Sequence, residues 1–451
     1  MVRAIRNRLA DVVHWLSRHW LLVGAIVVVL VGAGVGAYLL ATDDSDDERV
    51  ATAPAPQVVV REVPAPEETE DLGFPAFATK NTTRVSGADP IADAAAVALA
   101  VDPSTGGVQG PDAVTLVDAA DWPGGIAAAS LIAAPVGAPI LVTDSDEVPE
   151  LTENAIRALG PEGSDETAGR QAFVIGSAAT PDDLDTLEVK GASAAEVAAE
   201  VASLRERLTG RPDHLLLASS DEPAFAMPAA GWAARSGDPV LYVQRDSVPQ
   251  PTRKALSRYK GVPVYVLGPT SAISSKAFRE VEKLAPSAER VGAEEPVASA
   301  IEFARFASGD FGWNINDPGH GFVIANTERP LDAAVAAPLS ASGTWGPLLV
   351  TEDGDSVPEQ LRGYLLDLKP GYEQDPTRAL YNHLWLIGDT SALSVDFQAQ
   401  LDEIAEVAPV SSGSGASSLT PPPGTPESQP DTADDQGNSN PDRDTDQGPS
   451  P

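Results

Sequence analysis

Five basic residues that lie close together in an acidic chain are the best candidates for binding chemistry: Arg245, Arg253, Lys254, Arg258 and Lys260. The 451 residues have a formal net charge of −36, so this cluster reverses the local charge. The spacing of Arg253 and Lys254 from Arg258 places part of the set on one helix face. These cations could hold an anionic polymer through charge-assisted hydrogen bonds. Because exposed charge runs are common, a solvated helix face, or interfacial pairing with acidic neighbouring repeats, is the stronger interpretation.

The sequence offers no pattern typical of an active site or a metal centre. No two of the five histidines have metal-ligand spacing (His14, His19, His214, His320 and His383). The absence of cysteine excludes disulfides, thiolate catalysis and cysteine-ligated metals. No G-x-S-x-G motif or phosphate-binding G-K-[ST] loop is present, and no carboxylate pair stands out. The negative charge repels phosphate backbones. We therefore predict no enzyme activity, metal, cofactor or nucleic-acid partner.

Three glycines at the ends of short apolar runs mark a further candidate site. The runs AFVIG, VYVLG and LWLIG end at Gly176, Gly268 and Gly388. A helix N-terminus after such a strand can hold an anion. Glycine at this place more often permits the tight turn between strand and helix, and that is the stronger interpretation.

The strands and helices that position the candidate residues are predicted by a sequence pattern that occurs three times. The apolar runs GAPILVT, GDPVLYV and GPLLVT begin at Gly137, Gly237 and Gly346. After each run comes a polar turn and then Val-Pro, which opens a stretch with helical spacing. Strands that alternate with helices, and that are apolar almost throughout, predict parallel sheets covered on both faces.

A shorter signal separates the repeats, namely TRVSGAD, EVKGAS and ERVGAE, each before a helix of Ala, Val and Glu. We place repeat 1 at residues 81–187, repeat 2 at 188–288 and repeat 3 at 289–410. Residues 42–80 are acidic and rich in proline, which is typical of an extended linker. Residues 411–451 are mostly Ser, Pro, Gly, Asp and Asn, and we predict that they are disordered.

The start of the chain predicts a membrane anchor. Residues 1–19 are basic, and residues 20–41 carry no charged side chain. At about 1.5 Å per residue, a helix over 20–41 is about 33 Å long, enough to cross a bilayer. The run is longer than the apolar region of a signal peptide, which favours a retained anchor over a cleaved leader. Arginines before it and acids after it predict a single-pass protein of the cell membrane, with a cytoplasmic N-terminus and an extracytoplasmic bulk.

The repeats resemble the cell-wall-binding repeat 2 family of Gram-positive surface proteins. The resemblance rests on the G-x-P-(V/I)-L run, the Val-Pro helix start, the apolar run that ends in glycine and the R-V-x-G signal. It covers about residues 80–410. It implies three tandem toprim-like modules in a pseudo-threefold arrangement and a role in noncovalent attachment to a cell-wall polymer.

The predicted fold class is therefore α/β, with three tandem toprim-like repeats that have parallel-sheet cores, preceded by one transmembrane helix. The predicted function is that of a membrane-anchored, non-enzymatic protein outside the cell that binds a cell-wall glycopolymer or another envelope component. The basic residues of repeat 2 are the expected contact. Two alternatives remain open: a repeat scaffold for protein–protein interaction in envelope assembly, and an envelope hydrolase.

Overall fold

The computed structural model describes residues 77–409, apart from 86, 88, 103–109, 373, 374, 376 and 378. All of them belong to one of the two compact units of the chain, Pro66–Pro451. The predicted basic segment, most of the acidic linker and the tail at 411–451 lie outside the described residues.

The predicted transmembrane helix, and with it the predicted location at the cell membrane, must be corrected. Among the residues that the structure describes, no helix is long and apolar enough to cross a bilayer. The longest of these helices, α6 (Ala194–Thr209), has 16 residues. At about 1.5 Å per residue it measures about 24 Å, less than the roughly 30 Å of a bilayer core. The predicted span at 20–41 lies outside the described residues.

Two four-stranded sheets are parallel throughout, as the apolar strands predict. Sheet 1 has the order β4-β3-β5-β6, built from β3 (Val114–Asp118), β4 (Ile140–Thr143), β5 (Ala172–Ile175) and β6 (Thr186–Val189). Sheet 2 has the order β10-β9-β7-β8, built from β7 (Leu215–Ser219), β8 (Val240–Val243), β9 (Val264–Leu267) and β10 (Ala288–Val291). The central strands of both sheets are buried along their whole length, which explains why their sequences do not alternate.

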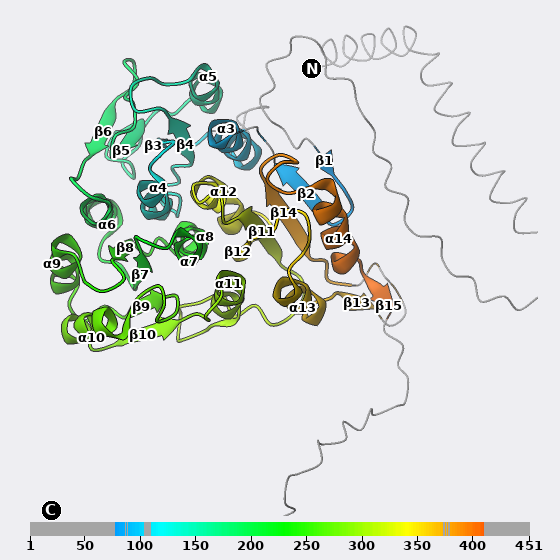
Figure 1. Ribbon diagram of the computed structural model, residues 1–451. Coiled ribbons are helices and arrows are strands. Elements are labelled where there is room, and N and C mark those ends of the chain that lie inside the picture. Colours follow the sequence, from blue (N-terminus) through cyan, green and yellow to red (C-terminus); the bar gives the residue numbers. More distant parts are fainter. Residues whose placement is uncertain are drawn as a thin grey trace, which may run out of the picture. The chain divides into compact units, whose positions relative to one another are not determined.

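A third sheet joins the two ends of the described chain. Sheet 3 has the order β1-β2-β14-β11-β12, built from β1 (Phe77–Ala78), β2 (Thr82–Val85), β11 (Gly321–Asn326), β12 (Leu348–Thr351) and β14 (His383–Ile387). Its strands are parallel except for β1, which runs antiparallel to β2. The first boundary signal of the sequence therefore pairs with the last sheet. A two-stranded sheet of β13 (Gly371–Tyr372) and β15 (Ala408–Pro409) completes the strands (Figure 1).

The other two boundary signals also connect one sheet to the next. Their strands, β6 and β10, form the edges of sheets 1 and 2. The helices that follow pack on the next sheet: α6 on β8, and α11 (Pro296–Arg305) on β12. In the same way α3 (Pro90–Val101), which follows β2, packs on β4. At each boundary signal the strand therefore belongs to one sheet, and the helix that follows it packs against another sheet.

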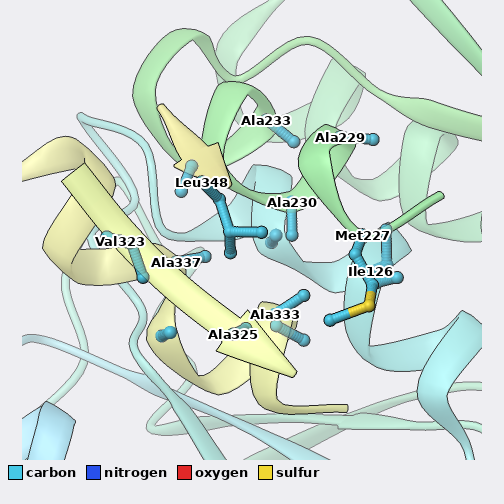
Figure 2. Packing of buried hydrophobic residues seen from close by; sticks show 14 of the residues in the cluster. Ile126, Met227, Ala229, Ala230, Ala233, Val323, Ala325, Ala333, Ala337 and Leu348 are labelled. Carbon is cyan, nitrogen blue, oxygen red and sulfur yellow. The ribbon is translucent and has the colours of Figure 1, made fainter. Parts of the chain in front are cut away.

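One alanine-rich helix from each sheet packs against the other two: α4 (Trp122–Ala128), α8 (Pro228–Ser236) and α12 (Asp332–Ala341). Figure 2 shows their small side chains, among them Ala230 and Ala333, packed beside Ile126 and Met227. A Cβ at Gly125 of α4 would lie 2.7 Å from Cδ1 of Leu331 and 3.0 Å from the Cβ of Ala334, so a larger residue there would force these side chains to shift. This mutual contact is what an arrangement of three units around a common centre requires.

The remaining helices cover the outer faces of the sheets. Three begin after Val-Pro, as predicted: α5 (Glu150–Leu159), α9 (Gln250–Arg258) and α13 (Glu359–Asp367). The short α7 (Pro223–Ala226) precedes α8, and the 3-10 turn η1 (Ala129–Leu131) follows α4. Sheets 2 and 3 each carry one more helix after the glycine turn, α10 (Ser275–Leu284) and α14 (Val395–Ala405). In sheet 1 the chain runs from β5 to β6 without such a helix.

Candidate functional site

The predicted basic cluster lies mainly on α9, beside sheet 2. The backbone of Pro249 is extended and opens the helix, and Thr252 Oγ1 donates to the carbonyl of Tyr242 at 2.5 Å, which holds the helix to β8. Ala255 and Leu256 are buried against the sheet. The basic side chains therefore lie on the opposite, solvent-facing side of α9.

Two arginines of this cluster pair with acidic residues of neighbouring helices. Arg253 forms an ion pair with Glu280 of α10. Arg258 Nη2 lies 2.5 Å from Glu206 Oε2 of α6, and its Nη1 donates to Ser203 Oγ at 3.0 Å. These contacts hold both guanidinium groups in place, while about half of the Arg258 side chain stays exposed. Both acids belong to residues 188–288, so the two arginines pair within repeat 2 and not with a neighbouring repeat.

The structure brings Lys254 and Arg258 together but not the whole cluster. Both line a groove of about 200 Å³ between α6 and α9, with Glu196, Ala199, Glu200, Ser203, Pro251, Ala255 and Tyr259. Lys260 is exposed just after α9, and Arg245 is exposed after β8, where its backbone N–H donates to Asp221 Oδ2 at 2.9 Å. Neither lines the groove. The groove thus offers two cations together with two carboxylates.

Arg290, on β10, was not singled out by the sequence, although it fills the glycine turn of sheet 2. Its Nη1 donates to the carbonyls of Gly268 and Pro269 at 2.7 and 3.0 Å, and its Nη2 donates to that of Ile273 at 2.7 Å. The guanidinium also lies 4.7 Å from the centre of the Phe278 ring. Burial lowers the pKa of Arg290 below its usual value. This turn is therefore a binding site for a guanidinium, occupied from within the chain.

Arg84, on β2, occupies the equivalent turn of sheet 3. Its Nη1 donates to the carbonyls of Gly388 and Asp389 at 2.8 and 2.9 Å, and its Nη2 donates to that of Ser394 at 3.3 Å. Its Nε donates to Gln398 Oε1 at 3.1 Å. Only 2% of Arg84 is exposed, and burial lowers its pKa to about 10. Since β2 lies near the start of the described chain and Gly388 near its end, this contact joins the two ends.

The glycine turns therefore present hydrogen-bond acceptors, and the anion site considered from the sequence is not formed at Gly268 or Gly388. The backbone explains the glycines, because φ is +64° at Gly176, +104° at Gly268 and +96° at Gly388. Side chains other than glycine rarely adopt this region. The tight-turn interpretation is thus confirmed.

A buried ion cluster that the sequence analysis missed joins α3 to α12. Arg329 contacts Asp93 Oδ2, and its Nε lies 2.8 Å from Asp332 Oδ2. Both carboxyl side chains are fully buried, so one guanidinium faces two acids. Burial, and then the charge of Asp332, raise the pKa of Asp93 to about 8. Burial also raises the pKa of Asp332 to about 6, against the opposing effect of Arg329.

This cluster predicts a pH-dependent stability that the variant Asp93→Asn isolates. The folded pKa of Asp93 lies above the value of about 4 in an unfolded chain, so its stabilisation is complete below pH 4 and is lost as the pH approaches 8. The free energy of unfolding of the wild type, minus that of the variant, should fall between pH 5 and 8 by at most about 1.4 kcal/mol per pH unit. Urea unfolding at each pH measures it, and a difference that stays flat or rises contradicts the prediction.

The side chains of the three histidines in the described chain make separate contacts, although the backbone N–H of His383 donates to the carbonyl of His320 at 3.0 Å. His214 Nδ1 lies 3.3 Å from Asp238 Oδ2, and this hydrogen bond raises the pKa of His214. His383 Nε2 lies 3.1 Å from Thr83 Oγ1, and burial lowers the pKa of His383. His320 lies beside an exposed aspartate. Within the described ranges, no three metal-ligating side chains converge.

Comparison with known proteins connects this fold to cell-wall proteins. The family described as "Cell wall binding domain 2 (CWB2)" matches residues 188–278. Among solved structures, the chain is similar to Cwp6 from Clostridium difficile (19% identity, TM-score 0.58) and Cwp8 from the same organism (17% identity, TM-score 0.55). Each match covers 72% of this chain, but 47% of Cwp6 and 52% of Cwp8, so the chain spans about half of their length.

No curated protein matches the sequence. The two solved structures, below 25% identity, show a shared fold. The matched segment 188–278 contains α6, sheet 2 up to β9, the basic helix α9 and the start of α10. Residues 188–278 therefore match the cell wall binding domain 2 family, which confirms over this segment the resemblance seen in the sequence.

Proposed function

We propose that this protein is a non-catalytic binding protein that attaches to a cell-wall polymer without a covalent bond. The match of residues 188–278 to a cell wall binding domain carries the proposal. The polymer would contact the exposed cations beside the groove between α6 and α9. This surface lies inside the matched segment and reverses the charge of an otherwise acidic chain.

The chemistry of the groove suits an anionic, hydroxyl-rich polymer. Lys254 and Arg258 offer ammonium and guanidinium donors to phosphate or carboxylate groups. Glu196, Glu200 and Ser203 line the same groove and offer acceptors to sugar hydroxyl groups. Since the pairing of Arg258 with Glu206 already fixes that side chain, little side-chain entropy is lost on binding.

A double variant tests this contact surface. Changing Lys254 and Lys260 to alanine removes two exposed cations, so the fold should be kept. Because an exposed charge contact contributes up to about 1 kcal/mol, binding to isolated cell walls should weaken by about tenfold. Co-sedimentation of the full chain with walls at low salt measures this loss, and the wild type should also release from the walls as salt rises.

The control for this experiment is the pair Lys276→Ala and Lys283→Ala on α10, which removes the same charge from another exposed helix of sheet 2. Binding should remain at the wild-type level. Equal losses in both double variants would assign the effect to net charge and contradict the proposed surface. Failure of the wild type to sediment with walls would contradict the proposed function itself.

A further inference from the structure

A hollow of about 530 Å³ opens at the carboxyl edge of sheet 1. Its walls are the turn after β4, the turn after β5 and the end of the edge strand β6. Five carboxylates and one cation line it: Asp146, Glu147, Glu153, Asp182, Glu188 and Lys190. Its volume falls in the range of small-molecule sites, about 300–1,000 Å³. We call it the sheet-1 hollow.

The hollow exists because sheet 1 lacks a helix that the other sheets have. Residues 176–185 lead directly from β5 to β6, whereas α10 follows the same turn in sheet 2 and α14 follows it in sheet 3. Arg253 pairs with Glu280 of that helix in sheet 2. The residue at the same place in sheet 1, four after Pro149, is Glu153, which lines the hollow.

Sheet 1 also lacks the arginine that fills the glycine turn in the other sheets. Strand pairing defines the equivalent position, because Arg84 pairs with the residue two before Gly388, and Arg290 pairs with the residue two before Gly268. In sheet 1 the residue paired two before Gly176 is Glu188. Where the other two sheets supply a guanidinium, sheet 1 supplies a carboxylate.

Two of the three carbonyl acceptors that hold this guanidinium are still present in sheet 1. In sheets 2 and 3 they are the carbonyl of the glycine and that of the next residue, which in sheet 1 are Gly176 and Ser177. No donor from the described part of the chain reaches either oxygen. Glu188 forms an ion pair with Lys190 at 2.7 Å and accepts a hydrogen bond from Thr180 Oγ1 at 3.5 Å, and the side chains of Glu188 and Lys190 are about half exposed or more. An ion pair this exposed is worth little, so a ligand can displace Lys190.

We propose that the sheet-1 hollow binds a ligand through a guanidinium or primary ammonium group, in the position that Arg84 and Arg290 fill in the other sheets. The N–H groups donate to the carbonyls of Gly176 and Ser177, and Glu188 supplies the opposite charge. The surrounding carboxylates add an attractive field and exclude anions. This site differs in position and in charge from the proposed polymer surface on α9, so either proposal can fail without the other.

Titration calorimetry of the full chain with agmatine and with cadaverine tests the site, because these probes carry a guanidinium and primary ammonium groups. Hexamethonium carries the same two positive charges but no N–H donor. We expect saturable binding of agmatine or cadaverine, and binding of hexamethonium at least tenfold weaker. The variant Glu188→Arg supplies the missing arginine, so it should fill its own site and reduce probe binding at least tenfold.

Two further variants keep the test decisive. Glu162→Arg makes the same charge change at an exposed position outside the hollow, and it should bind the probes like the wild type. Glu188→Gln keeps the size of the side chain and should weaken binding even if Glu188→Arg does not fold. The proposal is overturned if the wild type binds neither probe. Full binding in both Glu188 variants, or equal losses in Glu162→Arg, would also overturn it.

Discussion

Replacing Arg329 with alanine should lower the free energy of unfolding by about 3–5 kcal/mol at pH 8. The reason is the pair of fully buried acids, Asp93 and Asp332, that this one guanidinium faces. Without it both must lose their charge, which burial already favours, or remain as unpaired buried anions. Because protonation relieves this penalty, the loss should be smaller at pH 5. Urea unfolding at the two pH values measures it.

The variants Arg329→Lys and Arg207→Ala provide the comparison. An ammonium is a single point charge and cannot reach both acids as a guanidinium does, so the lysine variant should lose less than the alanine variant but more than nothing. Arg207 is exposed on α6, and its replacement should change stability by no more than about 0.5 kcal/mol. A loss below 1 kcal/mol for Arg329→Ala at pH 8 would show that the buried acids do not depend on this partner.

The sheets and most helices could be predicted from the sequence because their signals are local. The apolar runs at Gly137, Gly237 and Gly346 lead into β4, β8 and β12, and each Val-Pro opens a helix. The spacing of apolar residues and the proline at a helix start are signals that span only a few residues, so a single repeat is sufficient to reveal them. Three copies in the same order then predict three sheets of the same kind.

The pairing of β2 with β14 could not be predicted in the same way. It joins residues about 300 positions apart, and nothing near Arg84 indicates which sheet edge it will meet. The pattern held one unused signal, since Arg84 and Arg290 stand just before Val in two of the three boundary signals, while the third has Glu188. An arginine that recurs at the same position of a repeat indicates a structural role, even in an acidic chain where most charged side chains are solvated.

For the basic cluster and the buried ion cluster too, the sequence does not show which charged side chains will meet. Sequence spacing placed Arg253, Lys254 and Arg258 on one helix, and the structure agrees. Their partners, Glu280 and Glu206, come from other helices and are visible only in three dimensions. Asp93 lies in an alanine-rich helix, where an acid is ordinarily exposed, and its burial follows from the packing of α3 on α12.

Replacing Arg84 with alanine should have the second large effect, because it opens the junction between the start and the end of the described chain. The change removes hydrogen bonds to three backbone carbonyls and to Gln398 and leaves these acceptors buried or partly buried. A hydrogen bond from a charged donor is worth about 1.5–3 kcal/mol, and such losses are not additive, so we expect a loss of about 3 kcal/mol.

Which strands and helices lose stability in the Arg84→Ala variant shows whether Arg84 joins the two ends of the described chain or supports only its own strand. If β2 holds sheet 3 together, hydrogen exchange in the Arg84→Ala variant should accelerate in β14 and α14 while β7 and β9 of sheet 2 stay protected. Lys80→Ala is the matched control, since it removes only an exposed ion pair with Glu406 and should cost less than 1 kcal/mol. Faster exchange confined to β2 would contradict the junction and leave Arg84 as a local support of its own strand.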